Sequence, residues 1–69
     1  MTTLTLTLNG QMRQFPAPLT VAQLVLALDL TGKRVAIERN GEIVPRSTFA
    51  DTLLNPDDVL EIVVAVGGG

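Results

Sequence analysis

The chain begins with a regular alternation of threonine and leucine from Thr3 to Leu8. A period of two places the leucines on one face of a strand and the threonines on the other, which predicts a half-buried β-strand. The Asn9-Gly10 dipeptide that follows suits the positive φ angles of a tight hairpin turn, and Gln11 to Phe15 is then the returning strand. Two registers stay open. A two-residue loop sets Arg13 opposite Leu6, whereas a three-residue loop shifts the pairing by one residue.

An amphipathic helix is the next predicted element. Thr20 and Gln23 have the spacing of a capping box, in which each side chain satisfies a backbone amide of the other residue. Four apolar residues recur at intervals of three and four and form one stripe along the helix: Val21, Leu24, Val25 and Leu28. The sequence therefore predicts a helix from Val21 to Leu30, with Gly32 in the left-handed conformation that commonly ends a helix.

A second hairpin follows the helix. Val35 to Arg39 forms its first strand, another Asn-Gly dipeptide forms the turn, and Glu42 to Pro45 forms the second strand. Because proline lacks an amide hydrogen, this strand is expected to be short or to lie at an edge of the sheet. A two-residue turn places Arg39 opposite Glu42, which predicts a cross-strand ion pair between them.

The most apolar strand is the last one, predicted from Val59 to Val66. A short helical turn is expected before it, at Ser47 to Leu53. With Glu61 on the outer face, alternation turns four side chains of the strand inward: Leu60, Ile62, Val64 and Val66. Val63 and Ala65 are then left on the outer face.

The predicted order of elements is β-β-α-β-β-β, which specifies an α+β domain. We expect a mixed sheet of about five strands with one main helix packed on one face, and nothing in the chain is left to cover the other face. One core should lie between the helix and the sheet. Its expected members are Leu4, Leu6, Leu24, Leu28, Ile37, Leu60 and Ile62.

Two pairs of neighbouring charged residues are candidates for chemistry. Lys33-Arg34 could hold a phosphate, but no glycine-rich loop or further basic cluster accompanies the pair, and it is interpreted as a solvated helix exit. Asp57-Asp58 could act as paired carboxylates. These residues follow Asn55-Pro56 in a turn signal, however, and are interpreted as turn residues exposed to water.

Composition excludes several classes of function. The chain of 69 residues has neither cysteine nor histidine, so it can build no thiolate zinc site and no nucleophile–histidine pair. A net charge of −2, scattered cations and only two aromatic residues argue against nucleic-acid binding. No apolar run approaches the roughly 20 residues that span a bilayer, and a signal-peptide pattern is missing. We therefore expect a cytoplasmic protein that binds no membrane, metal or cofactor and is not an enzyme.

Three glycines, Gly67, Gly68 and Gly69, follow the last strand directly. Glycine adds no side-chain packing and loses the most conformational freedom on folding, so these residues do not stabilise the fold. A slim tail can instead thread a narrow channel and present a bare carboxylate to a nucleophile. We divide the chain into a domain, residues 1–66, and a flexible C-terminal tail, residues 67–69. On its own, the tail could also be a frayed terminus.

The whole chain resembles the ThiS family, the ubiquitin-like sulfur carriers of thiamin (thiazole) biosynthesis. This resemblance implies a ubiquitin-like β-grasp fold. One departure is Gly67, an extra glycine before the usual pair, which lengthens the flexible part of the tail. The resemblance rests on the turn Leu8-Asn9-Gly10, the helix start Leu19-Thr20-Val21 with Leu24, the segment Ala36-Ile37-Glu38-Arg39-Asn40-Gly41-Glu42-Ile43-Val44-Pro45-Arg46, and the di-glycine C-terminus Gly68-Gly69.

The resemblance also implies a mechanism and two partners. An ATP-dependent activating enzyme adenylates the carboxylate of Gly69, and sulfur derived from cysteine then replaces one oxygen to give a thiocarboxylate. The carrier delivers this sulfur to a thiazole synthase; ATP is used by the partner enzyme and is not bound by the carrier. We expect docking on the uncovered face of the sheet, because an exposed apolar patch is unfavourable unless a partner covers it. The residues expected there are Val63, Ala65, Ala36 and Ile43.

Two alternatives stay open. The small sulfur-carrier subunit of molybdopterin synthase resembles this chain in fold, tail and thiocarboxylate chemistry. Its members tend to be longer and lack the Asn-Gly-Glu-Ile-Val-Pro-Arg stretch, which favours the thiazole carrier. A non-catalytic β-grasp interaction module, in which the glycines are only a loose end, would tolerate deletion of the tail.

Overall fold

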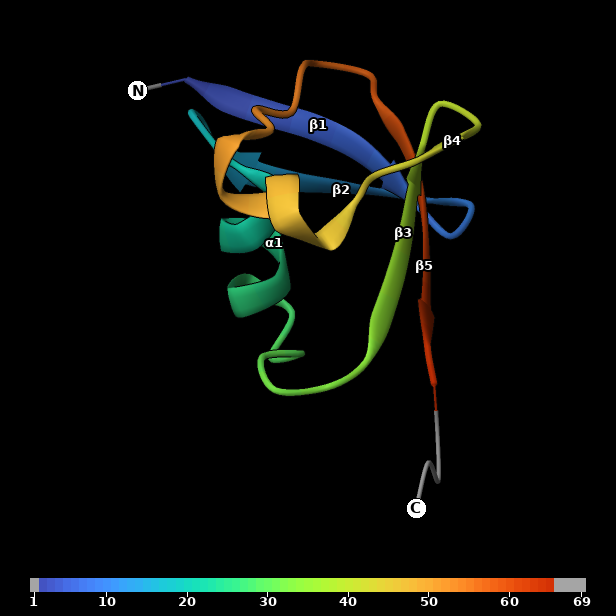
Figure 1. Cartoon of the computed structure of the whole chain (residues 1–69). Coiled ribbons are helices and arrows are strands. Elements are labelled where there is room, and N and C mark those ends of the chain that lie inside the picture. The colour runs from blue at the N-terminus through green and yellow to red at the C-terminus, as the bar shows by residue number, and fades with distance from the viewer. Residues whose placement is uncertain (1, 66–69) are drawn as a thin grey trace.

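The computed structural model of the protein describes residues 2–65, and within this range seven elements follow one another. They are β1 (Thr3–Leu8), β2 (Gln11–Pro16), α1 (Val21–Ala27), β3 (Val35–Arg39), β4 (Glu42–Ile43), the 3-10 helix η1 (Arg46–Asp51) and β5 (Val59–Val64). The strands form one sheet in the order β2-β1-β5-β3-β4, in which β5 is parallel to β1 and antiparallel to β3. Figure 1 shows α1 and η1 on the same side of this sheet. The predicted five-stranded mixed sheet with one main helix on one face is confirmed.

Both hairpins have two-residue turns. In the first, Leu6 lies opposite Arg13, so the two-residue alternative for the loop is correct. Asn9 and Gly10 have φ angles of 49° and 82°, the left-handed conformation that such a turn requires. The second hairpin repeats this conformation and places Arg39 opposite Glu42, as the sequence predicts.

β4 is shorter than predicted and ends at Ile43. The amide of Val44 still donates to the carbonyl oxygen of Ile37 at 2.8 Å. Pro45 follows and has no amide hydrogen to continue the ladder, and it leads into η1 as the N-cap residue. The strand lies at one edge of the sheet, as expected.

The predicted capping box is present at the start of α1. The Gln23 amide donates to Thr20 Oγ1 at 3.1 Å, and the Thr20 amide donates to Gln23 Oε1 at 2.8 Å. These two bonds satisfy amide groups that have no partner within the helix. The helix therefore begins at Val21, where the sequence predicts it.

The end of α1 differs from the prediction, because the helix stops at Ala27 instead of Leu30. Asp29 adopts a φ of 59°, and the Leu30 amide donates to the Val25 carbonyl oxygen at 3.0 Å. This is the hydrogen bond of a Schellman cap, with an aspartate in the left-handed position usually taken by glycine. Gly32 also has a positive φ, of 84°, but it lies in the loop beyond the helix end.

The core lies between the helical layer and one face of the sheet. Most of its predicted members are buried, whereas Leu28 and Ile62 are only half-buried at its margin. The predicted helical turn at residues 47–53 is η1, which turns Phe49 into the core next to α1. The buried apolar residues are Leu4, Leu6, Leu8, Phe15, Leu19, Val21, Leu24, Ile37, Phe49, Leu54 and Leu60.

Candidate functional site

The strand that leads toward the C-terminus, β5, lies in the middle of the sheet. Its pairing with β3 runs from Arg39 opposite Leu60 to Val35 opposite Val64. One further hydrogen bond joins the Ala65 amide to the Arg34 carbonyl oxygen at 2.9 Å. The pairing with β1 is much shorter and covers only Val59 and Leu60. Beyond Leu60, β3 is therefore the only strand that pairs with β5 in the described part of the chain.

Both asparagines of the hairpin turns hold β5 through their side chains. Asn9 Nδ2 donates to the Ile62 carbonyl oxygen at 3.0 Å, and the Ile62 amide donates to Asn9 Oδ1 at 2.7 Å. On the other side of the strand, the Val59 amide donates to Asn40 Oδ1 at 2.9 Å. An asparagine side chain carries both a donor and an acceptor, so Asn9 continues the ladder where β1 ends. The sequence predicts only turns at these residues.

Asp58 is the one buried charged residue among residues 2–65, with 6% of its surface exposed. Its carboxylate accepts hydrogen bonds from Arg39 Nε at 2.8 Å, Asn40 Nδ2 at 2.9 Å and the Asn55 amide at 2.8 Å. Burial alone raises the pKa of Asp58. The hydrogen bond from the Asn55 backbone, those from Asn40 and Arg39, and the Arg39 charge together hold the pKa below its ordinary value.

This arrangement corrects two predictions. Asp58 is a buried acceptor and not a turn residue exposed to water; only Asp57, exposed with a φ of 67°, has that role. Arg39 pairs with Asp58 and not with Glu42, although Glu42 lies opposite it in the hairpin. Because every hydrogen bond to Asp58 comes from a residue that shapes the start of β5, the role of this carboxylate is structural.

The face of the sheet opposite α1 and η1 is uncovered among the described residues (Figure 1). All four residues predicted for partner binding are exposed on it. Val63 lies directly opposite Ala36, and Ile43 lies directly opposite Glu38. Because Glu38 is two positions after Ala36 in β3, all of these side chains point to the same side of the sheet. The exposed fractions are 63% for Val63 and 66% for Ile43. We call this surface the open face.

The open face is larger than the sequence indicates. Val59 and Met12 extend it toward β1 and β2, because Val59 lies beside Thr7 and Thr7 lies opposite Met12. Met12 is 75% exposed. At the centre of the face, Glu38 lies directly opposite Glu61. Two carboxylates in this position repel each other and are unfavourable for folding.

The remaining predictions concern the tail and bound ligands. Val66 and the glycines Gly67, Gly68 and Gly69 lie outside the described residues, so the boundary between domain and tail stays a prediction. Among residues 2–65, no three or more acidic side chains are arranged to hold a metal ion. The helices of this range are too short to cross a membrane.

Comparison with known proteins gives consistent results. The family model of the ThiS family matches residues 6–69. The sulfur carrier protein ThiS of Bacillus subtilis is 40% identical over 50 residues, which cover 72% of this chain and 76% of that protein. A thiazole synthase of Paramagnetospirillum magneticum is 47% identical over 64 residues, which cover 93% of this chain but only 20% of the synthase.

The fold comparison agrees with the sequence comparison. The crystal structure of the thiamine biosynthesis protein ThiS from Geobacter metallireducens superposes with a TM-score of 0.79 at 32% identity, covering 96% of this chain and all of that chain. The predicted ubiquitin-like β-grasp fold is therefore confirmed. The chain belongs to the ThiS family, in which ThiS itself is a small sulfur carrier protein and not an enzyme.

Proposed function

We propose that this chain carries sulfur as a thiocarboxylate on Gly69 and delivers it for thiazole formation. The observation that carries the proposal is the position of β5, whose outward side chains lie on the open face and which precedes the three glycines in the sequence. The match to the ThiS family extends through residue 69 and so includes these glycines. A chain segment without side chains can approach a reacting centre more closely than any other.

Activation of the Gly69 carboxylate is the first step, because a carboxylate is a poor electrophile. One carboxylate oxygen attacks the α-phosphorus of ATP on the activating enzyme, and pyrophosphate leaves. The resulting acyl-adenylate has AMP as its leaving group. A sulfur nucleophile at the oxidation level of sulfide then attacks the carbonyl carbon and expels AMP, which leaves a thiocarboxylate. Gly69 is thus a substrate position, and the carrier supplies no catalytic group.

The open face supports docking to the enzymes that load and unload the tail. Val63, Ala65, Ala36 and Ile43 are exposed there, and Ala65 precedes the first of the three glycines by two positions in the sequence. A partner that covers this surface removes apolar area from water and at the same time positions the tail for reaction. We infer that both the ATP-dependent activating enzyme and the thiazole synthase bind this face, and that the reactions take place in the cytoplasm.

The similarity to thiazole synthases supports the second partner. In the Paramagnetospirillum protein, a segment similar to almost all of this chain belongs to the same polypeptide as the much longer synthase. A covalent link raises the effective concentration of one part near the other, which is useful only where the two must meet.

The test is the intact mass of the carrier after incubation with its activating enzyme, ATP and a sulfide source. We expect exchange of one oxygen for one sulfur, dependent on ATP and located at Gly69 by fragmentation. A reaction without ATP serves as the control. If the complete reaction leaves the mass unchanged, the proposal is wrong.

A further inference from the structure

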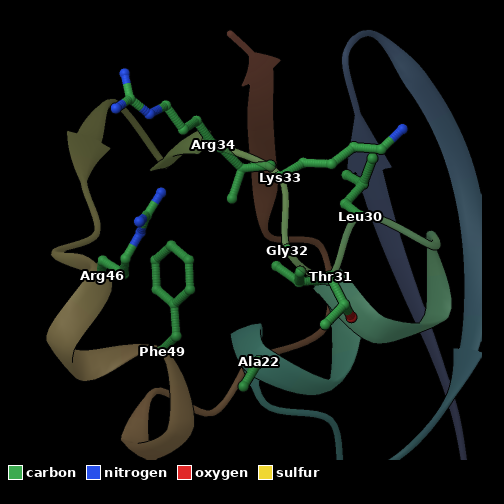
Figure 2. A pocket seen from close by; sticks show the side chains of 10 residues that line it. Ala22, Leu30, Thr31, Gly32, Lys33, Arg34, Arg46 and Phe49 are labelled. Carbon is green, nitrogen blue, oxygen red and sulfur yellow. The ribbon is translucent and has the colours of Figure 1, made fainter. Parts of the chain in front are cut away.

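A groove lies on the helical side of the protein, away from the open face. It has a volume of about 380 Å³ and is bordered by α1, by η1 and by the loop that joins α1 to β3. Figure 2 shows Phe49 and Arg46 rising from η1, Ala22 on α1 below them, and Arg34 and Lys33 across the groove on the loop. We call it the basic groove.

The charge of the groove is unusual for this chain. Three of the five cationic residues of a protein with net charge −2 line it, namely Lys33, Arg34 and Arg46. Within residues 2–65 the one ion pair joins Arg39 to Asp58, so none of these three cations has an acidic partner there. The clustering comes from folding, because Arg46 is distant in sequence from the other two residues.

The floor of the groove is apolar. Val25 and Val35 are half-buried and Phe49 is buried, and all three line the groove. In Figure 2 the guanidinium groups of Arg34 and Arg46 extend on the same side of the Phe49 ring, whereas the Lys33 ammonium points away from them. A guanidinium binds a carboxylate through two parallel hydrogen bonds, so two arginines beside an apolar floor match a ligand that is both acidic and apolar.

The position of the groove makes it independent of the open face. The groove lies between the helical layer and the covered side of the sheet, because residues of α1, η1 and β3 all line it. Figure 1 shows α1 and η1 on one side of the sheet, so a partner on the opposite, open face would leave the groove accessible. The groove also lies close to the end of β5, because the Arg34 carbonyl oxygen accepts from the Ala65 amide. A second protein bound in the groove would therefore lie near Ala65, the last residue that the structure describes.

We propose that the basic groove binds an acidic segment of a partner protein. One large apolar side chain of the segment lies on Val25 and Phe49, and its carboxylates pair with Arg34 and Arg46. A simple anion such as phosphate would use the arginines but not the floor. The inference goes beyond sulfur transfer and does not depend on the chemistry of Gly69.

The experiment titrates the isotope-labelled full chain with a blocked synthetic peptide in which a central phenylalanine is flanked by acidic residues. We expect saturable shifts of backbone amides at Val25, Arg34, Arg46 and Phe49, with a Kd on the order of 1 mM or tighter. The affinity should fall as salt is added, because charge pairs at an exposed rim are screened. Because the net charge of the chain is −2, the protein as a whole repels an acidic peptide. Any attraction must therefore come from the local cluster of cations in the groove.

Matched variants locate the site. Arg46→Glu should weaken binding at least about tenfold, whereas Arg13→Glu, the same charge change on β2, should weaken it less than about twofold. Replacement of the peptide phenylalanine by alanine should also weaken binding, because the peptide then has no large apolar side chain to pack on the apolar floor of the groove. An amide spectrum that differs from that of the wild type only near the substitution confirms that each variant is folded.

Several results would overturn the proposal. These are the absence of saturable shifts at the groove, equal losses from Arg46→Glu and Arg13→Glu, and equal binding of the alanine peptide. Pyrophosphate that shifts the same amides with equal affinity would show that the groove takes a free anion and no protein segment. Because no peptide measurement involves Gly69, failure here would leave the proposed sulfur transfer standing.

Discussion

The two faces of the sheet carry apolar side chains of similar kinds but in opposite surroundings. On β5, Leu60 is fully buried beneath the helical layer, whereas Val63 is 63% exposed on the open face. The covered face uses its apolar residues to fold the chain. The open face contributes little to folding, yet it keeps Val63, Ile43 and Met12 in water at some risk of aggregation. The alternation of a single strand thus separates the residues that stabilise the fold from the residues that we propose bind partners.

The largest expected effect is a loss of stability from a substitution on the covered face of the sheet. Leu60→Ala removes a fully buried side chain from the middle of the sheet and should lower the free energy of unfolding by about 2–5 kcal/mol. Val63→Ala, the corresponding truncation on the open face, should change it by less than about 0.5 kcal/mol. Urea denaturation followed by circular dichroism measures both. Equal losses from the two variants would refute the separation of the faces.

The next effect concerns the anchor at the start of β5. Asp58→Asn places an amide donor where Arg39, Asn40 and the Asn55 amide need an acceptor, and should cost about 1–3 kcal/mol near neutral pH. Asp57→Asn is the control, because Asp57 is exposed and asparagine tolerates its positive φ. If the two variants unfold at the same urea concentration, the Asp58 hydrogen bonds contribute no stability.

The same carboxylate predicts a pH dependence. Its pKa is lower in the folded protein than the ordinary value of 3.8, so the stabilisation is present above that value and is lost as the pH falls through the folded pKa. The wild-type protein should therefore lose more stability than Asp58→Asn when both are acidified. Parallel curves of stability against pH would contradict the role assigned to Asp58.

A substitution on the open face should affect binding and not folding. Val63→Asp places a charge where a partner must exclude water, and should weaken binding to the activating enzyme at least about tenfold. Leu26→Asp makes the same change at an exposed residue of α1 and should leave this binding unchanged. Calorimetric titration measures the affinities. An unfolded Val63→Asp protein would show that Val63 belongs to the core. Equal losses of affinity in Val63→Asp and Leu26→Asp would show that the open face is not the docking surface.

The smallest expected effect is a gain of stability from a substitution on the open face. Glu61→Lys replaces the repulsion between Glu38 and Glu61 by attraction and should stabilise the protein by a few tenths of a kcal/mol. Glu61→Gln should give roughly half of this gain, because it removes the repulsion only. The gain should disappear in high salt. A loss of stability in both variants would mean that Glu61 makes a favourable contact.

Local patterns in the sequence predict the sheet well. The alternation along Thr3–Leu8 and along β5 assigns Leu6 and Leu60 to the core and Val63 to the open face, because the pleat of a strand allows only two sides. Both Asn-Gly dipeptides specify their turns through backbone preferences of adjacent residues. The candidate docking residues follow from the same alternation, whereas their use by a partner stays a prediction.

Contacts between distant segments could not be predicted in this way. Glu42 lies opposite Arg39 in the hairpin, but Arg39 pairs with Asp58, which is 19 residues away in the sequence. The Asp58 carboxylate also accepts hydrogen bonds from Asn40 and from the Asn55 amide. The basic groove likewise needs η1 beside α1, and no local signal joins Arg46 to Lys33-Arg34. The early end of α1 has a different cause. Asp29 takes the left-handed position that local preference assigns to Gly32.

The central claim is that Gly69 carries the sulfur while the described domain holds the fold, and one comparison tests it most directly. Wild-type protein and a variant lacking Gly68 and Gly69 are each incubated with the activating enzyme, ATP and a sulfide source, and their intact masses are measured. We predict that the wild type exchanges one oxygen for sulfur and the variant does not, while both melt at nearly the same temperature, because the deleted glycines have no side chains to pack. Equal loading of the truncated protein would contradict the claim.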